Sequence, residues 1–200
     1  LSGLNSYVGP TTVSGGTLAL SGGAFLTNSA VITVASNAVL DVSGLSSPFT
    51  LAQALGSQTL SNSAPGAILS GTNNCTTGRL SLVADGVNPA FIQTNGTMTI
   101  SAGTMITVNN LGAPLAAGHH PLITAVTMGS PGQVTGALPP VTVTGNGADG
   151  TASLQINGTG GLDLVVASTI ATNPTNISYT VSGGVLTLSW PGDHLGWIAQ

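Results

Sequence analysis

Short segments in which apolar and polar residues alternate recur along this chain, and Gly, Asn and Ser separate them. An alternation of period two places apolar side chains on one face of a β-strand, while glycine and asparagine favour turns. The segments with this pattern are residues 17–20, 31–34, 38–42, 58–60, 67–69, 79–83, 97–100, 105–108 and 141–143. Only residues 51–55 have a pattern that is compatible with a short helix. The chain is therefore predicted to be all-β.

Self-similar segments predict how these strands are arranged. The segment at 14–21, Ser-Gly-Gly-Thr-Leu-Ala-Leu-Ser, has related copies at 95–101 and 182–189. Apolar positions that look equivalent recur at a nearly constant interval, at Leu18, Val39, Leu60 and Leu82. A repeat of this length suits one coil of a parallel β-helix, a single-stranded solenoid in which the strands of each coil stack on the next. The alternative is a β-sandwich, a fold that usually carries more charge and longer strands.

The character of the chain changes near residue 168. We assign residues 1–168 to the β-helix, with its last coils at about 119–168, and residues 169–176, rich in Thr and Asn, to a linker. The remainder, residues 177–200, is predicted to form a short C-terminal β-hairpin extension and a tail. Its two strands flank Ser182-Gly183-Gly184, a sequence that favours a tight turn.

The chain is almost without charge, which excludes several classes of protein. Charged residues make up 3% of the sequence, lysine and glutamate are absent, and Arg79 is the single basic residue besides three histidines. One arginine cannot neutralise several phosphates, so no nucleic-acid partner is expected. Helical bundles need charged outer faces, and no apolar run is long enough for a membrane-spanning helix. The single Cys75 cannot form an internal disulfide.

The residues that usually carry chemistry are scattered. Even the closest two aspartates in the sequence, Asp149 and Asp163, are well separated, so no paired carboxylates are expected and we predict that the chain is not an enzyme. Adjacent residues of a strand point to opposite faces, so His119 and His120 are not expected to bind one metal ion together. They are expected instead in a turn before Pro121. Cys75 is expected to be a structural thiol, and residues 145–150 a glycine turn rather than a calcium loop. No metal or cofactor is predicted.

The most distinctive cluster of side chains lies near the C-terminal end. Two tryptophans enclose an aspartate and a histidine in one short segment, and these are Trp190, Asp193, His194 and Trp197. Tryptophan is enriched where proteins stack on sugars or contact other chains. This cluster is therefore a candidate contact with a glycan or with a second chain; the alternative is that it covers the apolar end of the coils.

One segment resembles a known repeat. Residues 7–20, Tyr-Val-Gly-Pro-Thr-Thr-Val-Ser-Gly-Gly-Thr-Leu-Ala-Leu, resemble the autotransporter-associated β-strand repeat. The segments 118–124, 152–156 and 162–166 are similar to late strands and closing coils of such passenger proteins. Residues 190–197 resemble a tail found after β-helical repeats in exported proteins of Verrucomicrobia and related bacteria. The resemblance implies a right-handed β-helix, an extracellular or cell-surface location and no catalytic site.

These observations lead to a structural hypothesis. A β-helix leaves unpaired backbone at both ends, and this chain has few charges to block further pairing. We expect a non-enzymatic rod that assembles head to tail into a surface fibre or matrix. The expected strand-donating residues are Ile177, Tyr179, Val181, Val185, Leu186 and Leu188. The alternatives are a surface adhesin that binds glycans and an ice-binding β-helix, although threonines do not repeat as Thr-x-Thr in every coil.

Overall fold

The computed structural model describes residues 1–26, 28–51, 58–126, 131–168 and 178–189. Within these ranges every regular element is a β-strand, which confirms the predicted all-β class. No helix in the described residues is long and apolar enough to cross a membrane. The possible helix at 51–55 lies outside the described residues except for Leu51, which is buried.

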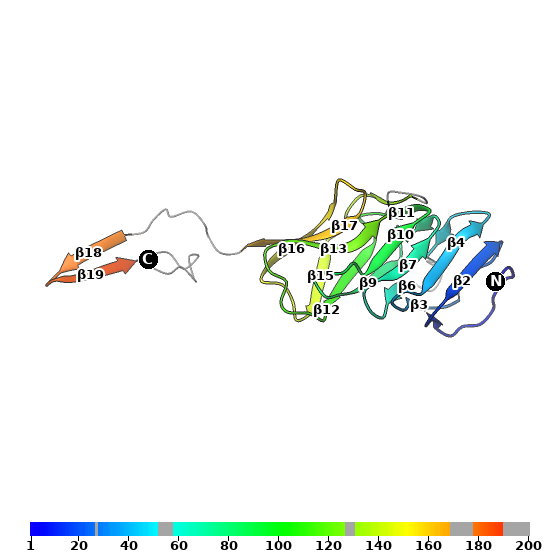
Figure 1. The fold of residues 1–200 in the computed structure, drawn as a ribbon, viewed down its shortest axis with the longest axis horizontal. Coiled ribbons are helices and arrows are strands. Elements are labelled where there is room, and N and C mark those ends of the chain that lie inside the picture. Colours follow the sequence, from blue (N-terminus) through cyan, green and yellow to red (C-terminus); the bar gives the residue numbers. More distant parts are fainter. Residues whose placement is uncertain (27, 52–57, 127–130, 169–177, 190–200) are drawn as a thin grey trace.

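Most strands belong to three sheets that are largely parallel (Figure 1). The first sheet consists, in spatial order, of β1 (Thr11–Val13), β3 (Val31–Val34), β6 (Thr59–Asn62), β9 (Arg79–Ala84), β12 (Met105–Asn110) and β15 (Val141–Gly145). The parallel part of the second sheet consists of β2 (Thr17–Gly22), β4 (Val39–Leu45), β7 (Ala67–Ser70), β10 (Phe91–Thr94) and β13 (Gly118–Ala125). The third sheet consists of β5 (Phe49–Thr50), β8 (Asn73–Asn74), β11 (Gly96–Ile100) and β14 (Gly132–Gly136).

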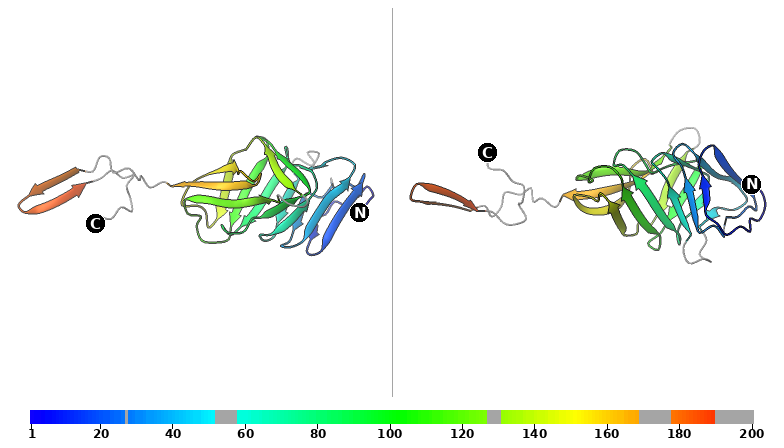
Figure 2. Two further views of the ribbon diagram at one scale, coloured as in Figure 1. Left: turned by 45° about the horizontal axis from the view of Figure 1, so that its top comes forward. Right: turned by 90° about the horizontal axis from the view of Figure 1, so that it is seen from below.

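The chain contributes strands to the first, second and third sheet in turn, and we call one passage through all three sheets a round. After β1 and β2, each round contributes one strand to the first sheet, one to the second and one to the third, from β3, β4 and β5 to β12, β13 and β14. Each strand inside a parallel run therefore pairs with the strand of the preceding round and with that of the following round. Figure 2 shows the same succession of strands from two other directions. The sheets thus grow together along one axis.

In each strand, alternate residues point into an interior that the three sheets share. In the first sheet the register aligns four buried side chains, which are Ile32, Leu60, Leu80 and Ile106. Phe49, Met98 and Val134 are buried at corresponding positions of the third sheet. These side chains belong to one continuous apolar cluster that extends through all three sheets. Burial of this apolar column is the main force that holds the rounds together.

Several buried polar side chains satisfy the backbone where the chain turns between sheets. Asn62 Nδ2 donates to the carbonyl oxygens of Ala64 and Val83, at 2.9 and 2.8 Å, and Asn62 Oδ1 accepts from Val83 N at 2.8 Å. Asn110 Nδ2 donates in the same manner to Ala113 O and Gly147 O. A buried backbone group without a partner is costly, so these amides make the tight corners possible.

Two rows of short polar side chains lie on the outer faces. The first-sheet hydroxyl row crosses all six strands and contains Thr12, Thr33, Ser61, Ser81, Thr107 and Thr142. The third-sheet polar row contains Thr50, Asn74, Thr99 and Thr135. Neighbouring strands are about 4.8 Å apart, so each row repeats at that spacing. Sequence reasoning missed these rows because the residues that form them are not evenly spaced along the chain.

The uneven spacing also corrects the predicted repeat length. Along the inner row of the first sheet, the interval in the sequence is longer from Ile32 to Leu60 than from Leu60 to Leu80. The expected constant interval between equivalent positions is therefore wrong. Leu60 and Leu82 are buried in the first sheet, whereas Leu18 and Val39 are half-buried residues of the second sheet.

The three similar segments are not structurally equivalent. The first copy includes β2 of the second sheet, and the second includes β11 of the third sheet. The third copy includes β19 (Val185–Ser189), which pairs only with β18 (Ser178–Ser182) in the described structure. All three have a turn with glycine followed by alternating residues, so their similarity reflects a common local geometry rather than a coil repeat.

The expectation of stacked coils up to residue 168 also needs correction. β16 (Gly150–Ile156) and β17 (Leu162–Ser168) form an antiparallel pair, and β17 is antiparallel to β13. This pair extends the second sheet beyond its last parallel strand. Asn157 fixes the turn between β16 and β17, because Asn157 Oδ1 accepts hydrogen bonds from the backbone N–H groups of Thr159 and Gly161.

The predicted C-terminal strand pair is confirmed. β18 and β19 are antiparallel, with Ser178 opposite Ser189 and Ser182 opposite Val185. Gly183 and Gly184 have φ values of 59° and 81°, the left-handed conformation that a tight two-residue hairpin turn requires. The linker at 169–176, Ile177 and residues 190–200 lie outside the described residues.

The close stacking of rounds predicts a clear effect of Gly71→Ala. Gly71 has a φ of 99°, and an added Cβ would lie 2.5 Å from Ser43 N of the neighbouring round. Gly16 also has a positive φ, of 66°, but open space surrounds its Cβ position. Both variants introduce backbone strain, but only Gly71→Ala also introduces a clash. We therefore expect Gly71→Ala to lose about 1–3 kcal/mol more stability than Gly16→Ala. Denaturant unfolding measures the difference; equal losses would contradict such close packing of rounds.

Candidate functional site

The C-terminal hairpin has one apolar face and one mostly hydroxyl face. Tyr179 pairs with Leu188, and Val181 with Leu186, so these four side chains share one face. The other face carries the remaining pairs, which are Ser178 with Ser189, Thr180 with Thr187 and Ser182 with Val185. Every residue of both strands is exposed, including Tyr179 at 72% and Val181 at 66%. The hairpin therefore presents an unpartnered apolar surface.

Such a hairpin is poorly stabilised by itself. A two-stranded sheet is marginal in water because its apolar face has nothing to pack against. Here β18 and β19 pair only with each other and with no strand of the three sheets (Figures 1 and 2). A partner that covers the face formed by Tyr179, Val181, Leu186 and Leu188 would stabilise the hairpin.

A second group of exposed apolar side chains lies at the end of the sheets where β1, β2 and β5 are the terminal strands. We call this the N-terminal end, and its exposed apolar side chains are Leu1, Leu4, Tyr7, Val8 and Phe25. The hairpin contributes five more exposed large apolar residues, so ten of the fourteen in the described residues belong to these two regions. Exposed apolar groups that cluster in this manner are typical of contact surfaces.

A hollow of about 410 Å³ opens at the N-terminal end. Its apolar lining comes from the segment after β2 and from the residues around β5, and includes Phe25, Leu26, Leu45, Pro48 and Phe49. β5 is the terminal strand of the third sheet and bonds to β8 on one side, where Phe49 N donates to Thr72 O and Leu51 N to Asn74 O. The hollow therefore lies beside a short strand that ends its sheet.

Neither surface carries a charged side chain. Residues 1–40 and residues 178–189 contain no Asp, Glu, Lys, Arg or His. Charged side chains on terminal strands normally prevent pairing with another chain. The backbone nitrogen of Leu1 donates to Ala19 O at 2.8 Å. Two surfaces that have exposed apolar groups and no charged side chains can approach each other without a desolvation penalty for ionised side chains.

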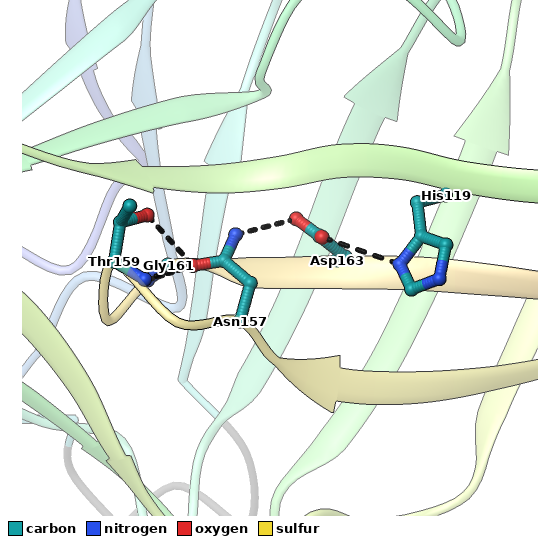
Figure 3. A network of polar contacts seen from close by, with 5 residues as sticks. All are labelled: His119, Asn157, Thr159, Gly161 and Asp163. Carbon is teal, nitrogen blue, oxygen red and sulfur yellow. Dashed lines mark hydrogen bonds and ion pairs between the residues drawn. The ribbon is translucent and has the colours of Figure 1, made fainter.

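The two histidines lie within strand β13, which corrects the expectation of a turn before Pro121. They do not form a pair, because their side chains contact different groups. His119 Nδ1 is 3.6 Å from Asp163 Oδ2, and Asn157 Nδ2 donates to the other carboxylate oxygen at 2.9 Å (Figure 3). This network connects β13 to the turn after β16. The described residues contain no group of three or more His, Cys, Asp or Glu placed to hold a metal ion.

His120 holds two segments together through its ring. Nδ1 lies 3.1 Å from Gly86 O, and Nε2 lies 2.8 Å from Ala116 O. Both partners are carbonyl oxygens, which only accept, so a ring nitrogen that carries a proton donates to the carbonyl oxygen beside it. His120 therefore ties the Asp85–Asn88 turn and the chain before β13 to the same strand.

The remaining candidate residues have structural surroundings. Burial raises the pKa of Cys75 to about 12, so its thiol stays protonated at neutral pH, as the prediction of a structural thiol requires. Two opposing effects act on the pKa of Asp85. Burial acts to raise it, but hydrogen bonds from Asn88 and Val87 together have the larger effect, so the pKa of Asp85 is lowered. Residues 145–150 connect β15 to β16, and Asp149 N in this turn donates to Leu115 O.

The structure places some of the predicted contact residues and leaves others outside its description. Tyr179, Val181, Leu186 and Leu188 lie together on the apolar face of the hairpin, while Val185 lies on the other face. Ile177, Trp190, Asp193, His194 and Trp197 lie outside the described residues. Sequence reasoning missed the apolar side chains of the N-terminal end, although the absence of charge from residues 1–40 was a signal that could have identified it.

Comparison of this chain with protein-family models, curated proteins and solved structures yields no match.

The surroundings of the two histidines predict unequal effects on stability. His120→Phe removes the contacts of both ring nitrogens with backbone carbonyl oxygens, and we expect a loss of about 1–2 kcal/mol. His119→Phe removes one contact of a side chain that is 58% exposed, and we expect a change of less than about 0.5 kcal/mol. Denaturant unfolding of both variants at the same pH measures the difference, and a larger loss in His119→Phe would contradict these roles.

Proposed function

We propose that this chain is a structural protein whose three sheets are the faces of one right-handed β-helix, and that copies assemble end to end into a fibre or matrix. The rotation of the strands through three parallel sheets supports a solenoid, because each strand then has its counterparts in the rounds before and after it. The antiparallel pair β16–β17 and the hairpin β18–β19 would follow this solenoid.

One observation carries the proposal of assembly. Terminal strands without charged side chains lie at one end of the sheets, and a fully exposed amphipathic hairpin follows β17 along the chain. Strands that end a sheet have unpaired backbone groups, which pair readily with another chain unless charge or a covering segment prevents this. The two surfaces differ from each other, so contact between them is head to tail, and its repetition builds an open chain of subunits where the rotation between neighbours does not close a ring.

A structural role also agrees with how the interior polar groups are used. Gln58 Nε2 donates to Leu26 O and Ser29 O, and Thr104 Oγ1 donates to Cys75 O. Each of these side chains connects segments that are far apart in the sequence, as the hydrogen bonds of Asn62 and Asn110 connect neighbouring rounds. Their hydrogen bonds maintain the shape of the sheets.

The resemblance of residues 7–20 to the autotransporter-associated repeat supports an extracellular location at a bacterial surface. In the structure this segment forms β1, a corner with glycines, and β2, and it buries Val13 and Leu20. The low charge of the chain suits a fibre outside the cell, because subunits without strong repulsion associate with little dependence on salt.

End-to-end assembly predicts that a charge on a terminal strand has a special effect. Thr12 lies on β1, which ends the first sheet, and Thr107 occupies the same hydroxyl row on the internal strand β12. We expect the unmodified protein to form fibres as its concentration increases, Thr12→Lys to reduce assembly at least tenfold, and Thr107→Lys to assemble normally. Sedimentation and electron microscopy measure this. A monomer at every concentration, or equal effects of both variants, would contradict the proposal.

The first-sheet hydroxyl row favours a second candidate function, namely binding of neutral glycans at the cell surface. Six hydroxyl side chains in register form a row on the outer face of one sheet, and hydroxyl groups donate hydrogen bonds to sugars and accept them. A glycan with regularly repeating hydroxyl groups would contact several rungs of this row at once.

This second function predicts selective retention of glycans. We expect the unmodified chain to bind neutral polysaccharides on a glycan array, and the double variant Ser61→Lys/Thr107→Lys to lose this binding at least tenfold. The control is Thr94→Lys/Thr124→Lys, which places the same two charges on the second sheet. Absence of binding by the unmodified chain, or equal loss in the control, would reject the hydroxyl row as a glycan site.

A further inference from the structure

We infer that the apolar face of the hairpin β18–β19 packs into the hollow at the N-terminal end of a second copy of this chain, beside β5. This inference rests on the proposed end-to-end assembly and specifies which surfaces meet. It assigns a donor surface, formed by Tyr179, Val181, Leu186 and Leu188, and an acceptor surface, the hollow around Phe25 and Phe49.

The donor surface has the properties of a segment that is stabilised by its partner. Its four apolar side chains share one face, and the strands behind them carry Ser and Thr on most of the opposite face. Insertion of the apolar face into a hollow would leave these hydroxyl groups toward water. The hairpin would thereby gain the additional packing layer that a two-stranded sheet needs for stability.

The acceptor surface offers apolar contacts and a terminal strand at the same place. The hollow of about 410 Å³ is lined by both residues of β5, Phe49 and Thr50, and by the partly exposed Phe25, which is 49% accessible. β2 is less suited to accept a strand, because Leu1 already bonds to Ala19 O and accepts from Ser21 N. Addition of a strand to the free side of β5 would extend the third sheet in the manner of β-augmentation.

A second copy is the occupant that charge favours. Neither the hairpin nor the set of residues that line the hollow contains a charged side chain, so no ionised side chain loses hydration when these two surfaces meet. The two regions hold ten of the fourteen exposed large apolar side chains in the described residues, and the hairpin pairs with no strand of the three sheets (Figure 1). This arrangement favours contact between copies, because each copy then presents one donor and one acceptor.

Cysteine cross-linking of the full chain tests which surfaces meet. Phe25→Cys places a thiol at the acceptor hollow, and Val181→Cys places one on the apolar face of the hairpin. Cys75 is buried with a raised pKa, so it does not compete for oxidation. After mild oxidation of an equal mixture of the two variants, we expect a covalent dimer between them. Thr180→Cys, on the hydroxyl face, serves as the matched control and is expected to give at least tenfold less dimer with Phe25→Cys.

Assembly of hairpin variants completes the test. We expect Val181→Ser/Leu186→Ser to need at least tenfold more protein than the unmodified chain for fibre formation, and Thr180→Ala/Thr187→Ala to assemble normally. Thermal unfolding verifies that the three sheets remain intact in both.

The outcomes separate this inference from the proposed function. Fibres that form equally well with both hairpin variants, without the cross-link, would overturn the inference and leave end-to-end assembly standing. A chain that stays monomeric at every concentration would overturn both. A disulfide that forms within single copies of a Phe25→Cys/Val181→Cys chain, at equal rate on dilution, would show that the hairpin packs on its own copy and would also overturn the inference.

Discussion

The parallel pairing of each strand with the strands of the neighbouring rounds is the interaction on which the rest of this structure depends. A parallel pair cannot be closed by a tight turn, so the chain must pass through the other two sheets before it returns to the first. That path creates the common interior and the corners. Strands of neighbouring rounds form hydrogen bonds with each other's backbone groups. The first round has no preceding round, so its strands are terminal strands at the N-terminal end.

The corners explain where this chain needs particular residues. Inside the sheets many apolar residues of suitable size suffice, and Leu, Ile and Val fill most inner positions. At the corners the backbone leaves the sheets, and buried amides such as those of Asn62 and Asn110 replace the missing backbone partners. Close contact between rounds adds a second requirement at Gly71, where a Cβ would meet the backbone of Ser43. Specificity in this fold is thus concentrated at the turns.

Local features of the fold were predictable from sequence, whereas the relation between rounds was not. Alternation predicts strands such as 31–34 and 105–108, and Gly183-Gly184 predicts the hairpin, because these depend on neighbouring residues. The row that connects Thr12 with Thr142 depends on corners of unequal length, so no fixed period shows it in the sequence. The antiparallel pair β16–β17 was missed for a related reason, since a strand pattern does not record the direction of its partner. The candidate site was predicted in part: the alternation of residues 178–189 identifies the donor hairpin, while the acceptor hollow arises from segments brought together only by folding.

The unequal corners have a consequence for how such a molecule can change over evolutionary time. The round from Leu60 to Leu80 uses fewer residues than the round from Ile32 to Leu60, although both advance the first sheet by one strand. Additional residues can therefore enter at a corner without disturbing the strands above and below. The length of the stack is determined by the number of strand layers and not by the number of amino acids. Outer loops can vary in sequence and length, while the length of the sheets along their common axis changes only by whole strand layers.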